Sequence, residues 1–482
     1  MPNAKIPISV AMGDGIGPEI MQATLNVLQA SEAPLEFHKV EIGEKVYLKG
    51  QPTGIEAETW NVIRNTKAFL KAPITTPQGG GFKSLNVTIR TTLGLYANIR
   101  PCVSYFPFIE TKHPEMDVVI VRENEEDLYA GIEYRQTPGV AHAIKLISTA
   151  GSEKIIRYAF EYARAHNRKK VTCCMKDNIL KLTDGLFHKI FEEVAKEYSD
   201  IIHDHWIVDI GAAKLADTPE IFDVLVMPNL YGDILSDIGA QISGSVGLVG
   251  SANIGEHGAM FEAIHGSAPK RANQNVANPS ALILASVLML SHLGLAEQAT
   301  HIHNAWLKTI EDGIHTYDIF KDGISREKVG TQEFSQAVIK NLGKKPETLQ
   351  SVTHKAMQSE DALGVHLNMT HQTRRLIGVD VYVHANPPLS NFLENVRHIS
   401  IGPLNLTMVT NRGVRVWPEG APETFCIDQW RLRFATKDPE RAVTQHDIVQ
   451  LLSAVERQKL DMIKTENLYS FDGQASYSQA QG

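Results

Sequence analysis

Asp233 and Asp237 are the first residues in this 482-residue sequence whose types and spacing suggest chemistry. Residues four apart share one face of a helix, so the two carboxylates would lie side by side. Carboxylate oxygens are ligands that Mg²⁺ and Mn²⁺ prefer. A bare pair of aspartates is more commonly a solvated acidic helix face, so the neighbouring motifs have to decide between these interpretations.

A glycine-rich loop at residues 13–19 follows an apolar alternation, Ile6, Ile8 and Val10, which predicts a half-buried strand. Pro18 is suited to the first turn of a helix after that loop. The loop resembles a GxGxxG dinucleotide motif only superficially, because no glycine stands at the third position. It predicts a tight turn rather than a phosphate cradle, and a Rossmann fold is not supported.

Short apolar runs alternate with helical segments along the first half of the chain. The runs are residues 117–121, 171–175 and 222–227, and the helical segments include residues 152–165 and 186–196. This alternation is typical of an α/β fold with a largely buried sheet. Each run is followed by polar residues, namely Arg122, Lys176 and residues 229–233. Open α/β sheets bind ligands beyond the carboxyl ends of their strands, so three polar ends together favour a site there.

Three longer motifs carry a family resemblance. They are TTPQGGGFKSLN at residues 75–86, NLYGDILSD at 229–237 and EAIHGSAP at 262–269. In this order they resemble the β-decarboxylating dehydrogenases of isocitrate, isopropylmalate and tartrate, over roughly the first two thirds of the chain. The resemblance implies a two-domain, three-layer α/β/α fold of the isopropylmalate-dehydrogenase type, and a homodimer with shared active sites. It implies a catalytic region at residues 1–343, with a large domain at about 1–100 and 240–343 and a small or clasp domain at about 101–239.

Within that family, isopropylmalate enzymes present an apolar pocket to the substrate side chain, whereas isocitrate enzymes offer a hydroxyl and an amide. Ser84 and Asn86 match that polar pair. The alternative interpretation is that they are ordinary turn or cap residues. Arg90, Arg100 and Arg122 match the arginines that bind substrate. Isocitrate is a trianion, and guanidinium groups bind carboxylates bidentately. We therefore expect isocitrate as the substrate.

The resemblance also implies the catalytic and metal-binding residues. Tyr129 and Lys176 match the family's proton-transfer pair, since a positioned phenol can return a proton and a buried lysine near cations can act as a base. Asp209, Asp233 and Asp237 match its Mg²⁺ or Mn²⁺ ligands, and in the family the upstream aspartate comes from the partner subunit. These residues imply oxidative decarboxylation of isocitrate to 2-oxoglutarate and CO₂, a reaction of the tricarboxylic acid cycle.

Cofactor residues follow from the same resemblance. They are Thr76, Glu262, His265, Gly266, Ser267, Ala268, Lys270, Arg271, Asn278, Tyr317, Asp318 and Lys321. NAD enzymes of the family place an acidic residue against the ribose diol, whereas Lys270 and Arg271 offer positive charge to a 2′-phosphate. The sequence departs from bacterial NADP enzymes that have tyrosine at Arg271 and arginine at Lys321. We expect NADP as the cofactor.

The last quarter of the chain forms a separate unit. Residues 344–375 are polar and predict a linker, and residues 376–470 predict a small α+β domain of ferredoxin-like order. Thr444 and Asp447 resemble a capping box ahead of a helix. The tail at residues 471–482 is rich in Ser, Gln and Gly and is expected to be flexible. This domain resembles the extra domain of a long bacterial NADP-type subgroup, for which locking the dimer is the preferred role and effector binding the second.

Composition limits the partners. The 47 Lys and Arg against 55 Asp and Glu give a net charge of −8, which disfavours nucleic acid as a partner. Four cysteines without CxxC spacing fit a reducing cytoplasm, and the most apolar stretch, residues 281–296, predicts a buried helix rather than a membrane span. The alternatives are an isopropylmalate or homoisocitrate dehydrogenase, which Ser84 and Asn86 disfavour, and a noncatalytic regulatory subunit, which the full ligand set disfavours.

Overall fold

The computed structural model describes residues 5–76, 84–355, 372–386, 388–421, 423–438 and 441–480. Residues 77–83 of the predicted substrate and cofactor motif, and residues 356–371 of the predicted linker, lie outside the described residues. The chain divides into two compact units. Unit 1 comprises Met1–Ala130, Leu146–Ile179 and Thr183–His366, and unit 2 comprises Gly131–Lys145, Leu180–Leu182 and Leu367–Gly482.

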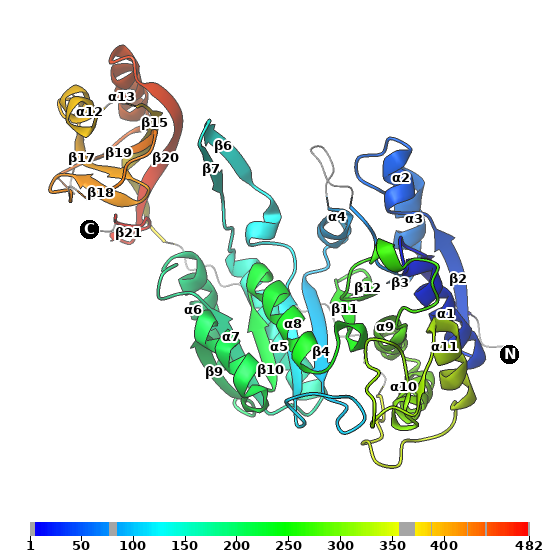
Figure 1. Cartoon of the computed structure of the whole chain (residues 1–482). Helices are drawn as coiled ribbons and strands as arrows, with labels where there is room; N and C mark the ends of the chain where they lie inside the picture. The colour runs from blue at the N-terminus through cyan, green and yellow to red at the C-terminus, as the bar shows by residue number, and fades with distance from the viewer. Residues whose placement is uncertain are drawn as a thin grey trace. The chain divides into compact units, whose positions relative to one another are not determined.

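Unit 1 is built on a ten-stranded mixed sheet, which has β2 and β9 at its two edges (Figure 1). From edge to edge the strands are β2 (Leu35–Val40), β1 (Ile6–Ala11), β3 (Ala68–Lys71), β12 (Ala259–Ala263), β11 (Gly250–Ile254), β4 (Ala97–Val103), β5 (Asp117–Glu123), β10 (Val224–Met227), β8 (Lys170–Met175) and β9 (Ile202–Ile207). Strands β5, β10, β8 and β9 run parallel, so their carboxyl ends meet at one edge. A two-stranded sheet, β13 (Ile314–His315) with β14 (Glu327–Lys328), also belongs to this unit.

Helices cover both faces of this sheet. In β8, Val171, Cys173 and Met175 belong to the cluster that includes α5 and α6, whereas Cys174 packs with α7 and α8 on the opposite face. The helices of unit 1 are α1 (Gly17–Ala30), α2 (Glu44–Leu48), α3 (Ala57–Asn65), α4 (Leu85–Thr92), α5 (Thr149–Ala165), α6 (Thr183–Ala195), α7 (Val208–Asp217), α8 (Asn229–Ile242), α9 (Ser280–His292), α10 (Ala296–Glu311) and α11 (Thr331–Lys340). Short 3₁₀ turns are η1 (Leu128–Ala130), η2 (Pro219–Ile221), η3 (Val246–Leu248) and η4 (Pro269–Arg271). The predicted three-layer α/β/α fold is confirmed.

Of two local predictions, the one for strand β1 is wrong and the one for helix α9 is confirmed. Strand β1 is not half-buried as its alternation predicted, because it lies inside the sheet and Ser9 is buried as well as Ile8 and Val10. Ser9 tolerates burial because its hydroxyl lies 2.6 Å from Thr66 Oγ1. Helix α9 is buried, as predicted, and packs against β11, β12 and α10. Among the described residues, no helix is both long and apolar enough to cross a bilayer.

Unit 2 contains an antiparallel sheet of ferredoxin-like order. Its four long strands lie in the order β17, β19, β15, β20 (Figure 1). Its elements are β15 (Arg374–His384), α12 (Leu389–Val396), β16 (Ser400–Ile401), β17 (Leu404–Asn411), β18 (Val414–Trp417), β19 (Gln429–Ala435), α13 (Gln445–Arg457), β20 (Asp461–Phe471) and β21 (Gln474–Ala475). The capping box of Thr444 and Asp447 at α13 is confirmed, with both reciprocal hydrogen bonds formed.

A β-hairpin from the first third of the chain also belongs to unit 2. Strands β6 (Glu133–Thr137) and β7 (Val140–Ala143) pair with each other and pack on the C-terminal sheet. His142 Nε2 lies 2.9 Å from Gln429 Oε1, and the His142 ring contacts the edge of Tyr382. The C-terminal domain therefore holds a hairpin that originates far away in the sequence.

Candidate functional site

Arg122, Tyr129 and Asp233 form the centre of the site. Arg122 is the penultimate residue of β5, Tyr129 lies on η1 and Asp233 lies in the first turns of α8. Arg122 binds the Asp233 carboxylate and donates two further hydrogen bonds to Asn229 Oδ1, at 3.0 and 2.7 Å. The Tyr129 hydroxyl donates to Asp233 Oδ2 at 2.5 Å. Gly232 permits this approach of helix and strand, because a Cβ there would lie 2.5 Å from Arg122 Cγ.

Arg100 connects this centre to the second predicted metal ligand. Its Nη1 lies 3.5 Å from Asp233 Oδ1 and 3.7 Å from Asp237 Oδ1, and it donates to Ser236 Oγ at 2.6 Å. The Arg100 Nε donates to Asn98 Oδ1 at 2.7 Å. Asp233 and Asp237 thus share one face of α8, as their spacing predicted, and that face is turned to buried arginines rather than only to solvent.

Arg90 and Glu262 bring substrate and cofactor candidates together. Arg90 Nη2 donates to Glu262 Oε1 at 2.9 Å, and the buried Lys71 Nζ lies 2.7 Å from Glu262 Oε2. Both contacts line a cavity of about 90 Å³ that Asn86, Arg100 and His265 also border. One cavity therefore joins residues of the first and third motifs with two of the predicted substrate-binding arginines.

Lys71 was missed by the sequence analysis. It ends β3, so it is another charged residue at a strand terminus, the same signal that identified Arg122 and Lys176. Ser84 precedes α4 but makes no side-chain capping hydrogen bond. A role as a helix cap therefore does not explain the serine at this position. The Asn86 Oδ1 atom is buried and has no hydrogen-bond partner among the described residues.

Burial and neighbouring charges shift the pKa values of the site. Burial lowers the pKa of Arg122 to about 9, and the nearby Arg100 and Arg90 contribute in the same direction. Burial raises the pKa of Asp237, which Arg100 only partly offsets. At Asp233 the arginines outweigh the effect of burial, so its pKa is lowered. Three guanidinium groups converging in a buried space create a site that favours a small polyanion.

Lys176 and Asp209 form a second, separate group. Lys176 follows β8 and Asp209 lies in the first turn of α7, and the Nζ and Oδ1 atoms are 2.6 Å apart. The hydrogen bond from Lys176 lowers the pKa of Asp209. Within the described part of the chain, no hydrogen bond or ion pair joins these two residues to Arg122, Tyr129 or Asp233. Lys176 is half-buried beside an acid, in contrast to the buried lysine among cations that its motif suggested.

The first glycine-rich turn, at residues 13–19, packs against the predicted cofactor loop. Gly15 has a φ of +59°, and a Cβ there would lie 2.0 Å from Ser267 O. Ile16 N donates to Ser267 O at 2.8 Å, and Thr75 Oγ1 lies 2.6 Å from Ser267 Oγ. These contacts hold the loop in place. The segment forms a tight turn, as its sequence predicted. Thr76 is half-buried next to it.

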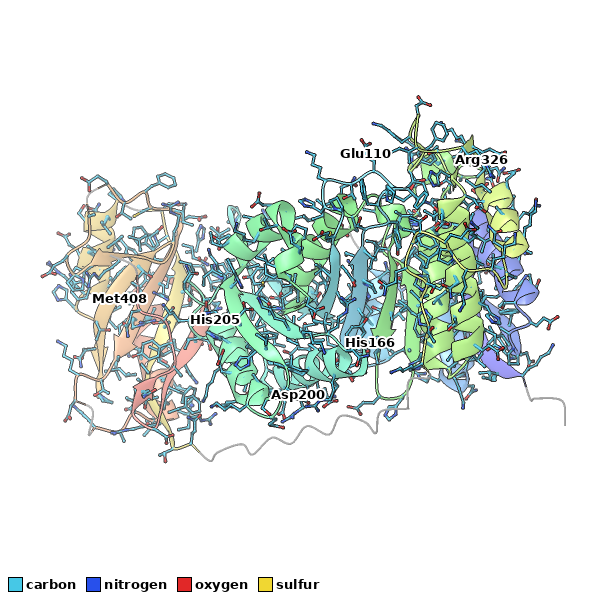
Figure 2. All side chains as sticks on the ribbon, turned by 90° about the horizontal axis from the view of Figure 1, so that it is seen from below. Glu110, His166, Asp200, His205, Arg326 and Met408 are labelled. Atoms are coloured by element: carbon cyan, nitrogen blue, oxygen red, sulfur yellow. The ribbon has the colours of Figure 1, made fainter. Side chains whose placement is uncertain are left out.

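The remaining cofactor candidates range from the buried Asn278 to the exposed Lys270, Arg271 and Lys321. Arg271 places its guanidinium 4.5 Å from the centre of the Tyr317 ring. Asn278 donates to Asp318 Oδ2 at 3.0 Å, and Lys321 Nζ lies 3.0 Å from an oxygen of Glu110, which Figure 2 labels. The other members of the loop are His265 and Gly266, joined by a hydrogen bond, Ala268, whose φ is +38°, and the exposed Lys270.

This fold and site define an α/β protein with a buried cationic cleft for a small polyanion beside paired carboxylates. The chain belongs to the isocitrate/isopropylmalate dehydrogenase family, whose model matches residues 7–338. The model for the C-terminal domain of bacterial isocitrate dehydrogenase matches residues 374–482. The resemblance found in the sequence is therefore confirmed.

Relatives extend over the whole chain. A protein of Rickettsia bellii named isocitrate dehydrogenase [NADP] is 52% identical over 478 residues, covering 99% of both chains. One of the same name from Thermus thermophilus is 44% identical and covers 98% of this chain and 95% of its own length. A crystal structure of a Thermus thermophilus protein matches with a TM-score of 0.92 and 42% identity, over 100% of this chain and 97% of that one.

Proposed function

We propose that this protein is an NADP-dependent isocitrate dehydrogenase, which oxidises and decarboxylates isocitrate to 2-oxoglutarate and CO₂. The observation that carries the proposal is the convergence of the buried Arg90, Arg100 and Arg122 near Asp233 and Asp237. Burying three cations is unfavourable unless an anion compensates them, and a tricarboxylate supplies three negative charges. The full-length relatives named isocitrate dehydrogenase [NADP] support the same substrate and cofactor.

Ser84 and Asn86 favour isocitrate over isopropylmalate. Asn86 borders the same cavity as Arg90, so its Nδ2 can donate to a substrate carboxylate, and its unpartnered Oδ1 can accept from a substrate hydroxyl group. An apolar isopropyl group would leave that buried amide unsatisfied, which costs about 1–3 kcal/mol. A substrate panel with isocitrate, homoisocitrate and isopropylmalate separates these alternatives.

The carboxylates fit a divalent cation. Asp233 and Asp237 offer oxygen ligands from one helix face, and their side chains are 34% and 66% exposed, so an ion and its waters can reach them. This donor set suits Mg²⁺ or Mn²⁺ rather than a softer metal. Once bound, such an ion polarises the substrate oxygens and stabilises negative charge during decarboxylation.

The chain's own residues bind the substrate and move protons. The three arginines hold the carboxylates of isocitrate, and Lys176, once deprotonated to the neutral amine, accepts the proton of its hydroxyl group. Tyr129 returns a proton to the carbon that loses CO₂. Burial, and then the hydrogen bond to Asp233, raise the pKa of Tyr129, so the phenol keeps its proton at neutral pH and can donate it.

Two copies of the chain complete each site. Because Lys176 and Asp209 make no hydrogen bond or ion pair with the Asp233 cluster among the described residues, we assign them to the active site of a second copy. Ile210 and Ile234, which follow Asp209 and Asp233, are each 50% exposed and offer apolar surface next to the catalytic residues. A cytoplasmic homodimer acting in the tricarboxylic acid cycle, without nucleic acid or membrane partners, fits these features.

NADP binding is assigned to the exposed basic residues Lys270, Arg271 and Lys321. They offer charge-assisted hydrogen bonds to a 2′-phosphate. Glu262 and His265 border the cavity next to Arg90, where the nicotinamide would meet the substrate. A noncatalytic regulatory subunit is the second candidate, but Tyr129, Lys176 and all three aspartates are present.

An initial-rate assay tests the proposal directly. The purified protein is given isocitrate and Mg²⁺ with either NADP or NAD, with and without a chelator. We expect NADPH formation that the chelator abolishes and a higher kcat/KM for NADP than for NAD. Absence of turnover with both nucleotides would support the noncatalytic alternative, and a preference for NAD would refute the cofactor assignment.

A further inference from the structure

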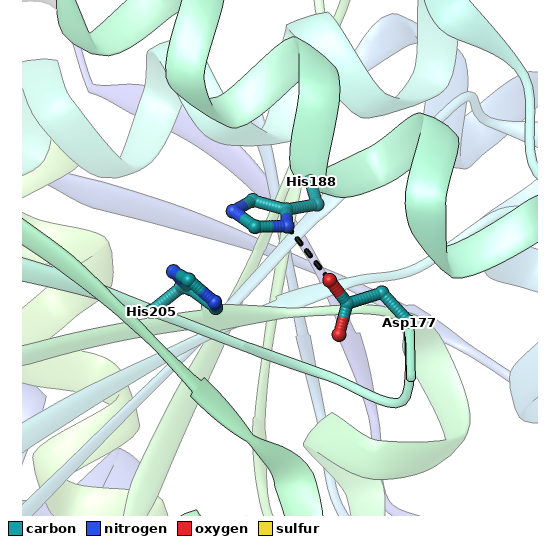
Figure 3. Close-up of side chains that lie close together, drawn as sticks. All are labelled: Asp177, His188 and His205. Carbon is teal, nitrogen blue, oxygen red and sulfur yellow. Dashed lines mark hydrogen bonds and ion pairs between the residues drawn. The ribbon is translucent and has the colours of Figure 1, made fainter. Parts of the chain in front are cut away.

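Asp177, His188 and His205 converge at a place that the proposed reaction does not use. Asp177 follows β8, His188 lies on α6 and His205 lies in the edge strand β9 (Figure 3; Figure 2 labels His205). One potential ligand atom from each residue lies within 4.8 Å of the other two. Three separate elements of unit 1 thus direct metal-ligating groups to one point.

The register of the sheet explains why His205 faces α6. Strands β8 and β9 are parallel neighbours, with Cys173 opposite His205. Alternate residues of β9 point the same way, and the rings of His203 and His205 contact Phe191 and His188, both on α6. The imidazoles of His188 and His205 have centroids only 4.0 Å apart.

A carboxylate lies near each nitrogen of the His188 ring. Its Nδ1 lies 2.8 Å from Asp177 Oδ2, and its Nε2 lies 3.6 Å from Glu192 Oε1 (Figure 3 shows the first contact). An outer carboxylate beside the second nitrogen of a ligating histidine is the usual way in which metal sites orient that ring.

An ion pair between Asp177 and His188 accounts for only part of this geometry. The Asp177 Oδ1 atom is buried and has no hydrogen-bond partner within the described ranges, although buried carboxylate oxygens are normally paired. The His205 side chain makes no hydrogen bond with any described residue, although its ring lies beside that of His188. An ion pair between Asp177 and His188 would not require this second imidazole. A cation between the three side chains would satisfy both observations.

We propose that Asp177, His188 and His205 bind a Zn²⁺-type ion, at a site distinct from the Mg²⁺ site of Asp233 and Asp237. Two imidazoles and one carboxylate form a ligand set that Zn²⁺ prefers and Mg²⁺ does not, with water completing the coordination. Zn²⁺ would need ligand distances of about 2.0–2.2 Å, and the exposed His205 can move to supply its nitrogen.

Binding there connects two parts of the proposed active site. Asp177 is next to Lys176, and β9 leads directly into α7, which carries Asp209. The ion would therefore tie the Lys176 turn to the strand before Asp209. We assign it a structural and modulating role that goes beyond the dehydrogenase reaction.

The test titrates metal-free, full-length protein with Zn²⁺ in excess Mg²⁺, which occupies oxygen-ligand sites, and without substrate or nucleotide. We expect one Zn²⁺ per chain by calorimetry, and Co²⁺ should give the visible absorption of a site with nitrogen ligands. Loss of a residue that only orients a metal ligand typically weakens metal binding by about 10- to 100-fold. His205→Ala removes a ligand itself, so it should weaken Zn²⁺ binding by at least this much. Zn²⁺ should also raise the Tm of the wild-type protein but not that of His205→Ala.

His203→Ala is the matched control, because His203 lies two residues away on the same face of β9. It should retain Zn²⁺ binding. His205→Ala leaves the Asp177 and His188 pair intact, so a purely structural ion pair predicts no difference between the two variants. Equal affinities of wild type and His205→Ala, or no Zn²⁺ bound in excess Mg²⁺, would overturn the site. Because no turnover is measured, the result is independent of the proposed dehydrogenase activity.

Discussion

Lys176 and Asp209 form an ion pair, with Nζ 2.6 Å from Oδ1, on the side of the sheet that carries β8 and α7. Arg122, Tyr129 and Asp233 interact with one another and not with that pair, among the residues that the structure describes. Both groups are needed for the proposed chemistry. The lack of a direct contact between these two groups of described residues therefore supports a site shared between two copies.

Hybrid dimers test the shared site. Lys176→Met and Asp233→Asn should each be inactive alone, because each removes a group from every site. When the two variants are mixed, unfolded and refolded, random pairing would restore about a quarter of the wild-type sites if they are shared between copies. Recovery of activity is measured against each variant refolded alone, and a mixture as inactive as its components would contradict sharing.

Tyr129→Phe tests the proton donor. It removes the hydroxyl that donates to Asp233 but leaves the ring under Arg122, whose guanidinium carbon lies 4.8 Å from the ring centre. We expect decarboxylation of the keto acid intermediate to fall by about 10²–10⁴-fold, the usual contribution of a general acid. Hydride transfer to that intermediate is measured in a separate assay, in which the oxidation of NADPH is followed, and should fall much less. Equal losses in the two half-reactions would argue against the assignment.

Arg271→Ala tests nucleotide preference. Arg271 is stacked on Tyr317, so it is held in place for a phosphate at low entropic cost. Its removal should lower kcat/KM for NADP by about tenfold or more, since one charge-assisted hydrogen bond is worth about 1.5–3 kcal/mol. The value for NAD should change little. Lys328→Ala is the control, because Lys328 contacts the ring of Phe320 and has no assigned phosphate role.

The fold could be predicted because its signals are local. Apolar runs such as residues 117–121 and 171–175 became β5 and β8, and the capping box at Thr444 began α13. Strand β20 was not predicted from the sequence, because the strand mixes charged and apolar residues and lies near an edge of the sheet. Its identity as a strand depends on pairing with β15, which lies far earlier in the chain.

The site could be predicted only in part, for the same reason. Motif order identified Arg90, Arg100 and Asp233, and the structure brings them together. Lys71 has no motif of its own in the sequence analysis, and its importance appears only when β3 and β12 pair and place it beside Glu262. Pairing between distant strands is a tertiary property that spacing along the chain does not encode.

Removal of residues 374–482 tests the role of the C-terminal domain. The hairpin of β6 and β7 would lose its contacts with Gln429 and Tyr382. We expect a lower Tm and faster proteolysis at residues 133–143, because the hairpin would keep only its own pairing. The isolated dehydrogenase region should still turn over isocitrate, and an unchanged Tm would argue against a stabilising role.

A less disruptive version replaces one contact. His142→Ala removes the hydrogen bond to Gln429 and the ring contact with Tyr382. It should reproduce part of the increase in proteolysis, while His398→Ala, elsewhere in unit 2, should not. This pair of variants separates loss of the hairpin contact from general weakening of the domain.

His303 and His354 predict acid sensitivity of the stability. His303 Nδ1 lies 3.0 Å from His354 Nε2, and His354 Nδ1 lies 3.1 Å from Ser291 Oγ. Burial lowers the pKa of His303 to about 3 and that of His354 to about 4, from an ordinary value near 6.5. Above pH 6.5 both histidines are neutral in the folded and unfolded chains, so they add no pH dependence. Between pH 6.5 and about 4 the unfolded chain binds protons that the folded chain does not, so stability falls as pH falls.

His303→Gln, His354→Gln and the double variant test this linkage. Glutamine cannot titrate, so the drop in Tm between pH 7 and pH 5 should be smaller in each variant than in the wild type. Each histidine can contribute up to about 1.4 kcal/mol per pH unit in that interval. His301→Gln, an exposed position on the same helix, is the control and should keep the wild-type pH dependence. Lower stability at every pH, with an unchanged slope, would show that the two rings contribute packing but not proton linkage.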